Sequence, residues 1–451
     1  MRPDRLAAKR WCAIGTAAGI ALSLTALTGC GNDEPQTTPK PTASATTPAP
    51  SSDALETAAA TPRIAYTYDG GIQVRDANTL ELVADIKLDG LNRLNPVGDG
   101  RTLMVTTAAG AFQVLDMGVW ASAHGDHSHY FAANPVLTDQ VFAATRGVHV
   151  VSHDGNTTLF DDESGHVMVF ESDEALDADR ELREFTTTAP HHGVAVPLED
   201  GVLVVSEGTS EARTGARAFD ANDVEIAKSD DCPGLHGEGV TAGEVVVFGC
   251  SDGVLTYSEG AFKKIASPAP AGRISTLSTT EESPIALGNY TVEGDTTPRV
   301  ALIDTAAGTI TPVELPTTYA SSGLARTDDG AALVLGTDGQ IHVIDVTTGT
   351  VTAAYPVVTP WELPAEAHGA DPVPRILVLE GMIYVTDPAT KTIHVVDPTN
   401  GSIWKSAELD VVPGELQGVS GEGAGEHHHH DGEEGHEDEH DHDDHEDEHD
   451  E

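Results

Sequence analysis

The residues best suited to chemistry in this sequence are its histidines, because 21 His stand beside only 24 Lys and Arg. Neutral imidazole is the commonest metal ligand in proteins and binds zinc in tetrahedral sets. The densest internal group is His124-Gly125-Asp126-His127-Ser128-His129. Three imidazoles and one carboxylate in so short a segment predict a local metal chelate. A solvated polar loop is the alternative.

Further histidines lie beside glycine at similar places in the chain: His191-His192-Gly193, His236-Gly237 and His368-Gly369, with His149 and His153 around a neighbouring hydrophobic run. The His-Gly steps precede the turns Asp200-Gly201, Ala242-Gly243 and Glu380-Gly381. Taken singly, each histidine is an ordinary polar loop residue. If the segments are equivalent units of a closed repeat, however, these histidines converge in space and predict a shared metal site.

The elements that would position them are short β-branched runs separated by Asp-Gly, Glu-Gly and Thr-Gly turns. A hydrophobic strand that ends in aspartate, followed by a turn and a second strand, recurs at Asp76, Asp116, Asp220, Asp304, Asp345 and Asp397. Degenerate copies near Phe170 and Tyr257 bring the number of units to eight. Units of about 40 to 50 residues are typical of a β-propeller.

We therefore predict an all-β fold, a β-propeller of eight blades over residues 62–420, with seven blades as the alternative. The first unit supplies three strands, and the segment Pro413–Gly421 (PGELQGVSG) could add the fourth and close the ring.

The net charge of −49 argues against nucleic acid as a partner, because so negative a surface repels phosphate. Part of this charge lies in residues 421–451, where His427, His428, His429, His430, His436, His440, His442, His445 and His449 alternate with Asp and Glu. No core is possible there, so we predict a disordered metal-binding tail. A solubility tail or an engineered tag are the alternatives.

The first residues carry basic side chains, then an apolar run, then Leu27-Thr28-Gly29-Cys30. This pattern predicts a lipoprotein signal peptide over residues 1–29 and lipidation of Cys30, with a single membrane-spanning anchor as the alternative. Residues 30–61 are rich in Thr, Pro and Ser and predict a disordered tether. We expect an exported monomer, held by lipid at the outer face of the cell membrane.

Once the signal peptide is removed and Cys30 is lipidated, only Cys232 and Cys250 remain in the folded domain. In an oxidising compartment we predict that they form a disulfide. A metal site that contains cysteine is the alternative.

The chain resembles the AztD-type extracytoplasmic zinc metallochaperones over roughly residues 62–420. The resemblance rests on HGDHSHYF (from His124), VHVVSHDG (from Val148), PHHGVAVPLEDG (from Pro190) and the segment from Cys232 to Cys250. It implies Zn(II) at the propeller mouth and at a His-rich segment, and direct transfer to the solute-binding protein of a zinc ABC transporter. The lipobox and the acidic tail extend beyond the family pattern.

Three functions therefore compete: a zinc metallochaperone without enzymatic activity, a propeller enzyme such as a quinone-dependent dehydrogenase or lactonase, and a surface protein that only buffers zinc or binds a partner. No Ser or Cys nucleophile stands beside a recognisable base, and clustered histidines favour the metallochaperone. The same nitrogen-rich sites could also bind copper or nickel in place of zinc.

Overall fold

The structure is a computed structural model that describes residues 54–423 except 126, 328 and 365–371. The described residues belong to one compact unit, Pro48–Glu451. Within them the secondary structure is β-strand, with two short 3-10 helices, η1 (Ser172–Glu174) and η2 (Glu199–Gly201). The all-β prediction is thus confirmed. No helix of the described part is long and apolar enough to span a membrane. The predicted signal peptide, Cys30 and the His-rich tail lie outside the described residues.

Eight antiparallel sheets follow one another along the described chain, and their strands are named below from the inner to the outer edge of each sheet. Sheet 1 contains β36 (Leu416–Val419), β2 (Arg63–Tyr68), β3 (Gly71–Asp76) and β4 (Leu82–Lys87); sheet 2 contains β5 (Arg93–Pro96), β6 (Thr102–Thr106), β7 (Phe112–Asp116) and β10 (Val136–Phe142). Sheet 3 contains β11 (Gly147–His153), β12 (Asn156–Asp161), β13 (His166–Glu171) and β14 (Arg183–Thr186); sheet 4 contains β15 (Ala195–Pro197), β16 (Leu203–Gly208), β17 (Arg213–Phe219) and β18 (Glu225–Ser229).

The remaining sheets follow the same order. Sheet 5 contains β19 (Glu238–Thr241), β20 (Val245–Cys250), β21 (Gly253–Ser258) and β22 (Ala261–Ala266); sheet 6 contains β23 (Gly272–Arg273) and β24 (Leu277–Ser278), both paired with β25 (Ile285–Val292), then β26 (Arg299–Asp304) and β27 (Thr309–Glu314). Sheet 7 contains β28 (Tyr319–Arg326), β29 (Ala332–Gly336), β30 (Gln340–Asp345) and β31 (Thr350–Pro356); sheet 8 contains β32 (Arg375–Leu379), β33 (Met382–Asp387), β34 (Thr392–Val396) and β35 (Ile403–Glu408).

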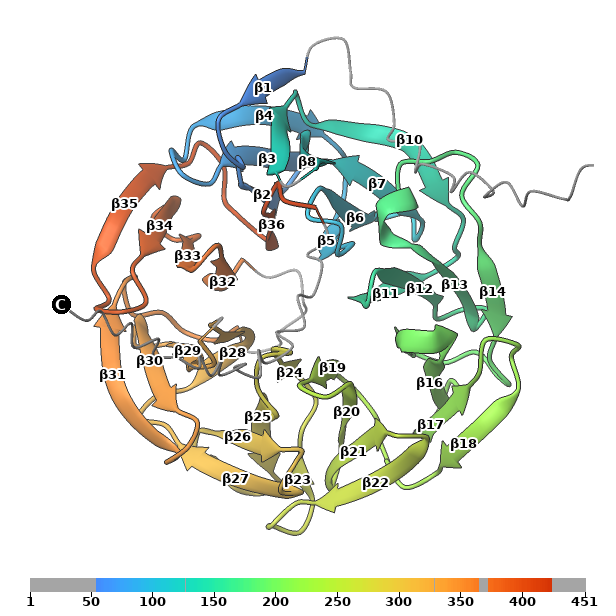
Figure 1. Cartoon of the computed structure of the whole chain (residues 1–451). Coiled ribbons are helices and arrows are strands. Elements are labelled where there is room, and N and C mark those ends of the chain that lie inside the picture. Colours follow the sequence, from blue (N-terminus) through green and yellow to red (C-terminus); the bar gives the residue numbers. More distant parts are fainter. Residues whose placement is uncertain (1–53, 126, 328, 365–371, 424–451) are drawn as a thin grey trace, which may run out of the picture. The chain divides into compact units, whose positions relative to one another are not determined.

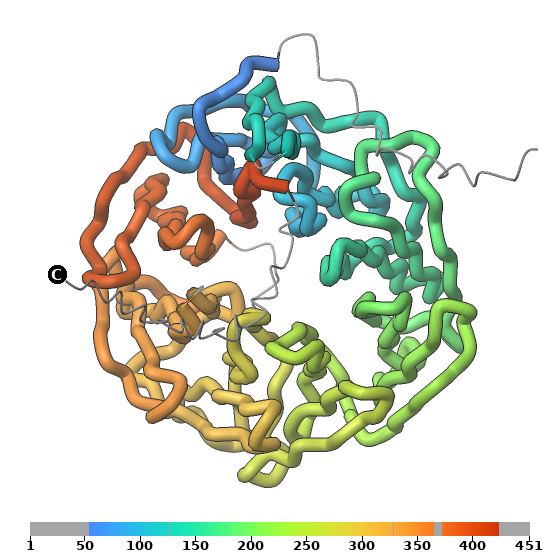
Figure 2. Tube along the Cα trace, in the orientation of Figure 1, coloured from blue at the N-terminus to red at the C-terminus, as the bar shows by residue number. Residues whose placement is uncertain are grey.

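The eight sheets stand in a ring (Figures 1 and 2), and the strand of each sheet that lies nearest the centre is the first one named above, except in sheet 6, where it is β24 and not β23 (Figure 1). Eight clusters of buried apolar side chains lie between them, and each cluster combines residues of two neighbouring sheets. The pairs run without a gap from sheets 1 and 2 round to sheets 8 and 1. The hydrophobic core is therefore itself a ring, which is the packing of a β-propeller-like fold.

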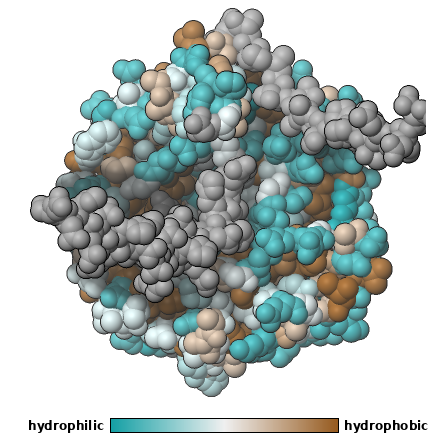
Figure 3. Space-filling model, viewed as in Figure 1, coloured by the Kyte–Doolittle hydropathy of each residue, from teal (hydrophilic) through white to brown (hydrophobic). Residues whose placement is uncertain are grey.

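The burial pattern of each strand follows its place in the sheet. The second strand of sheet 2, Thr102–Thr106, is buried along its whole length and has no alternation. In the outer strand of sheet 8, Ile403–Glu408, exposed and half-buried residues alternate from Trp404 onward. Hydrophilic side chains cover much of the face seen in Figure 3, interspersed with isolated apolar ones.

The ring is closed by strand β36, as the sequence predicted. Residues Leu416–Val419 pair antiparallel with Arg63–Tyr66 of β2, so the last described strand becomes the inner strand of the first sheet. This pairing completes the four strands of sheet 1 and joins the two ends of the described chain.

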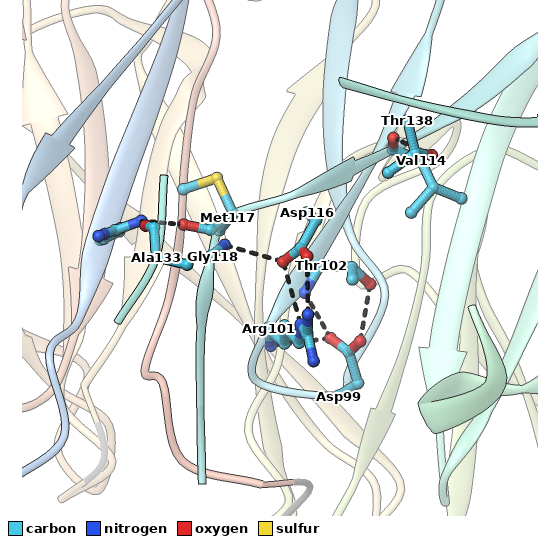
Figure 4. A network of polar contacts seen from close by, with 10 residues as sticks. Asp99, Arg101, Thr102, Val114, Asp116, Met117, Gly118, Ala133 and Thr138 are labelled. Carbon is cyan, nitrogen blue, oxygen red and sulfur yellow. Dashed lines mark hydrogen bonds and ion pairs between the residues drawn. The ribbon is translucent and has the colours of Figure 1, made fainter. Parts of the chain in front are cut away.

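The recurring aspartates end the third strand of their sheets, where they fix the following turn. In sheet 2, Asp116 accepts a hydrogen bond from the backbone N–H of Gly118 at 2.8 Å, and Arg101 donates to both of its carboxylate oxygens at 3.0 and 2.7 Å (Figure 4). Asp345 likewise accepts from the backbone of Thr347 and Thr348. The repeat that the sequence displays is thus a turn-capping device rather than part of a binding site.

A three-stranded sheet lies apart from the eight, formed by β1 (Leu55–Thr57), β9 (His127–Ala132) and β8 (Val119–His124). The hairpin β8–β9 is inserted between the third and fourth strands of sheet 2. Residues 55–57 fall in the predicted disordered tether, which therefore ends earlier than expected. They are ordered because the free edge of β9 offers backbone partners to an extended chain.

Candidate metal centre

Three histidines from three neighbouring sheets meet where the inner strands begin. His149 is the third residue of β11, His192 precedes β15 by three residues, and His236 precedes β19 by two. Because all inner strands start at the same end of the ring, equivalent positions come together there. The convergence expected from the sequence is present for these three residues.

The rings are in contact with one another. The ring centroids lie 4.7 Å apart for His149 and His192, 5.2 Å for His192 and His236, and 6.2 Å for His149 and His236. The Nε2 atoms of His192 and His236 are 3.3 Å apart. We call His149, His192, His236 and the neighbouring Asp162 the inner cluster.

The hydrogen-bond partners fix the tautomers of two of these rings. Nδ1 of His192 lies 2.6 Å from Oδ2 of Asp162, and Nδ1 of His236 lies 2.7 Å from the carbonyl oxygen of Ser275. Both acceptors require a proton on Nδ1, so Nε2 of each neutral ring carries a lone pair. Two lone pairs therefore face each other at 3.3 Å. That arrangement is favourable when a cation lies between them.

His149 is the most deeply placed of the three. Burial, and then the neighbouring His192 and His236, lower the pKa of His149 to about 3, with Arg93 contributing in the same direction. Burial also lowers the pKa of His236. Nδ1 of His149 is buried and has no hydrogen-bond partner among the described residues. A buried ring nitrogen without a partner is costly, and a bound metal ion would satisfy it.

Asp162 is the member of the inner cluster that sequence reasoning missed. It follows β12 directly, and its carboxylate lies within 4.8 Å of ligand atoms of His149 and His192. It also receives the backbone N–H of Gly193 at 3.3 Å. Its signal in the sequence is the pair Asp161-Asp162 at a strand end, but nothing in one sequence separates it from Asp161, whose oxygens accept from the backbone of Thr145 and Arg146.

A disulfide holds the loop that carries His236. Cys232 and Cys250 are bonded, as predicted, with a sequence separation of 18. The backbone N–H of His236 donates to the carbonyl of Gly249 at 3.0 Å, next to Cys250. The bond therefore fixes the approach to β19 and the position of the imidazole. The alternative of a cysteine-containing metal site is excluded while the disulfide is intact.

The segment around His124 forms a second group of ligands on hairpin β8–β9, which we call the hairpin cluster. His124 pairs with His127 across the turn, and His129 lies two residues further on the same face. Their ligand atoms lie within 4.8 Å of one another, and His124 and His127 are exposed. Nδ1 of His129 is 2.6 Å from Oε1 of Glu56 in β1. Glu56 was not predicted, because it lies in the supposed tether.

Two predicted ligands lie outside both clusters. His191 is buried, with Nδ1 at 2.9 Å from the carbonyl of Ala189 and Nε2 at 2.9 Å from the hydroxyl of Ser206. Both of its ring nitrogens are therefore already satisfied by the fold, and its neighbour His192 faces the inner cluster instead.

His153 occupies the other end of β11 from His149. Its Nδ1 lies 3.0 Å from Glu281 and its Nε2 lies 2.6 Å from Glu244. Burial disfavours its charge, but the hydrogen bonds to Glu281 and Glu244 outweigh this and raise the pKa of His153 to about 9. It is thus a charged partner of two carboxylates that come from sheets 5 and 6.

The other predicted ligands lie outside the described residues. These are Asp126, His368 and the tail histidines His427, His428, His429, His430, His436, His440, His442, His445 and His449.

Comparison with known proteins supports the resemblance. No protein-family model matches the chain. It is 28% identical over 376 residues to the zinc chaperone AztD of Citrobacter koseri, a match that covers 80% of this chain and 87% of that protein. The crystal structure of Citrobacter koseri AztD is similar with a TM-score of 0.69 and 25% identity, covering 80% of this chain and 98% of that one. The expected likeness to AztD is therefore confirmed.

A more distant structure shares the fold alone. The dihydro-heme d1 dehydrogenase NirN is similar with a TM-score of 0.51 and 11% identity, over 79% of this chain and 74% of that one.

Proposed function

We propose that this chain is a zinc metallochaperone that binds Zn(II) at the inner cluster and passes it to the solute-binding protein of a zinc ABC transporter. The observation that carries the proposal is the 3.3 Å separation of the two Nε2 atoms of His192 and His236. Two nitrogens bound to one zinc ion at about 2.0 to 2.1 Å with tetrahedral geometry lie roughly 3.3 Å apart. The pair is thus spaced for a common zinc ion before the ion arrives.

Each residue of the inner cluster has a separate part in binding. His192 and His236 direct lone pairs at the ion, and His149 adds a third imidazole whose ring is neutral at physiological pH. Asp162 supplies negative charge and holds the proton on Nδ1 of His192, the arrangement in which a carboxylate orients a zinc-bound histidine. Three neutral nitrogens form a donor set that suits zinc and has no thiolate to make release slow.

The hairpin cluster and the tail would collect the ion. His124, His127 and His129 lie on the hairpin β8–β9, Asp126 stands between them in the sequence, and the tail histidines alternate with carboxylates that attract cations. Ligands of this kind exchange quickly, so zinc captured there can move to the inner cluster. His368 precedes β32 and is proposed as a further ligand near the start of the inner strands.

The placement of the protein is part of the same proposal. A signal peptide ending before Cys30, lipidation of that cysteine and the tether would hold the domain at the outer face of the cell membrane. The eight sheets would be the blades of a monomeric eight-bladed propeller. Likeness to a zinc chaperone over most of the chain supports this function over the enzymatic alternative, because the dehydrogenase resembles it in fold alone.

The test measures zinc in a full-length variant in which the nine tail histidines are replaced by asparagine. We expect it to retain a zinc ion at the inner cluster in competition with a fluorescent chelator, and to lose that ion when His192→Asn and His236→Asn are added. His166→Asn, on the outer part of sheet 3, is the matched control. Stopped-flow transfer to a purified solute-binding protein then separates a chaperone from a zinc buffer. Unchanged zinc binding in the double variant would overturn the assignment of the site.

A further inference from the structure

A cavity of about 360 Å³ opens directly beside His192. It is lined by Thr209, Ser210 and Glu211 from the loop that joins β16 to β17, by Arg213 at the start of β17, and by Gly234 from the loop before β19. One residue that lines the cavity therefore belongs to the inner cluster. The other lining residues carry two hydroxyl groups, one carboxylate and one guanidinium, and of these the hydroxyl and guanidinium groups recognise an anion.

Arg213, like Arg93, lacks the polar side-chain contacts that most arginines of the described residues make. Arg101, Arg183, Arg217 and Arg299 each pair with a carboxylate. The guanidinium of Arg213 makes no hydrogen bond or ion pair within the described residues. Burial and the nearby Arg273 lower the pKa of Arg213, and Asp162 opposes that effect. Its positive charge is therefore held near the inner cluster without a counter-ion of its own.

Arg273 does not line this cavity but contacts Gly234, which does. Its Nη1 donates to the carbonyl of Gly234 at 3.3 Å and to the hydroxyl of Ser251 at 3.0 Å, both of which are neutral acceptors. Arg273 also lies two residues before Ser275, whose carbonyl oxygen is 2.7 Å from Nδ1 of His236. Two guanidinium groups thus stand beside a cation-binding cluster in a protein whose net charge is −49. A positively charged wall at this place opposes zinc unless an anion accompanies the ion.

We propose that Arg213 and Arg273 form an anion subsite that binds a carboxylate group next to the zinc ligands and brings it into position to take the ion. This inference rests on the proposed function. A carboxylate suits both neighbours, because it pairs with guanidinium groups through two oxygens and is also a zinc ligand. During transfer a Zn–O bond to the carboxylate forms as the Zn–N bond to His192 breaks, with no change of oxidation state. The released imidazole of His192 keeps its hydrogen bond to Asp162.

The test compares two chelators of different charge. The protein is the full-length chain with the tail histidines and His124, His127 and His129 changed to asparagine, loaded with one equivalent of zinc. Stopped-flow extraction by EGTA, which offers carboxylates, is measured beside extraction by neutral 1,10-phenanthroline. We expect Arg213→Gln and Arg273→Gln to slow extraction by EGTA about tenfold or more, as loss of local steering charge does, and to leave extraction by phenanthroline unchanged.

Two controls separate the subsite from other effects. Arg93→Gln removes a charge near His149 but does not line this cavity, so it should leave the EGTA rate unchanged. Glu211→Gln tests whether the carboxylate of Glu211 itself occupies the subsite. If it does, the rate of zinc extraction by EGTA will rise in this variant. Equal slowing by Arg93→Gln, or equal slowing of both chelators, would overturn the proposal.

The source of the carboxylate is distinguished with acetate in excess during transfer to the solute-binding protein. If a carboxylate side chain of the solute-binding protein occupies the subsite, acetate competes with it and slows transfer. If a free carboxylate occupies the subsite, added acetate speeds transfer. If the loaded variant holds no zinc at all, the proposed function fails. If it holds zinc and the arginine variants behave like the parent, only the subsite fails.

Discussion

The Nε2 atoms of His192 and His236 lie 3.3 Å apart, although 44 residues separate the two histidines along the chain. One comes from the loop before sheet 4 and the other from the loop before sheet 5. Each ring is held from behind by an acceptor on Nδ1. A metal ion between them would therefore add a link between two sheets that also pack together through apolar side chains.

Zinc should accordingly stabilise the fold through His236. In the tail-substituted variant, zinc at about a thousand times its dissociation constant should add roughly 4 kcal/mol to the free energy of unfolding. His236→Asn should remove most of this gain, measured by urea denaturation with and without zinc. His191→Asn is the control: it should lower stability without zinc by about 1 to 3 kcal/mol because Ser206 loses a buried partner, and it should keep the zinc-dependent gain.

Asp162→Asn should weaken zinc binding at the inner cluster about 10- to 100-fold, which is the usual effect of removing a carboxylate that supports a zinc-bound histidine. The amide has almost the same shape, so the fold should be retained. Isothermal titration measures the affinity, and Asp161→Asn provides the comparison at the adjacent position. An affinity equal to that of the parent would show that Asp162 does not serve the metal.

His153 should make stability depend on pH. Its pKa is about 9 in the folded protein and about 6.5 in the unfolded chain. The folded state thus binds the proton more tightly, so the stabilisation is fully present below pH 6.5 and is lost as the pH rises through 9. It amounts to at most about 3 kcal/mol. Urea denaturation at pH 6 and pH 9.5 should show this loss in the parent and not in His153→Gln. His166→Gln should behave like the parent.

Removal of the disulfide should affect stability and zinc together. Replacing Cys232 and Cys250 by alanine should cost about 3 kcal/mol, as expected for a loop of this length. Because the same loop places His236, the affinity of the inner cluster for zinc should fall as well, whereas the hairpin cluster should be unaffected. Denaturation and zinc titration of the double variant measure the two effects. Normal zinc affinity would mean that the loop holds its shape without the bond.

Glu56→Gln should weaken zinc binding at the hairpin cluster. The carboxylate orients His129 by accepting the proton of Nδ1, and β1 carries it to the edge of the hairpin. Because the pair is exposed, we expect a loss of less than about tenfold, near the lower limit for a residue that supports a metal ligand. The measurement is zinc titration in a full-length variant with the inner cluster and tail histidines replaced. Glu81→Gln, on an exposed turn of sheet 1, is the control.

Much of this arrangement could be predicted from the sequence, because a repeat assigns equivalent places to residues far apart in the chain. That reasoning brought His192 and His236 together correctly. It could not choose between His191 and His192, since successive residues of an extended segment point in opposite directions. Nor could it separate His149 from His153, which share one strand but lie roughly 13 Å apart along it.

Other parts of the site depend on tertiary contacts alone. Asp162 acquires its position from the neighbouring sheet, and Glu56 from a strand that forms only because β9 has a free edge. Arg213 looks like an ordinary surface arginine until its lack of a partner is visible. Each of these groups contacts or lies near a proposed metal ligand that is distant in the sequence. Such contacts produce no recognisable pattern in the local sequence.

The pairing of β36 with β2 also sets an order in time. Val419 pairs with Arg63, so the ring cannot close until the chain has been synthesised as far as Val419. A chain that stops earlier would present histidines but no completed ring to hold them in register. A zinc-competent inner cluster is thus the product of finished synthesis, and incomplete copies would compete poorly for a scarce metal.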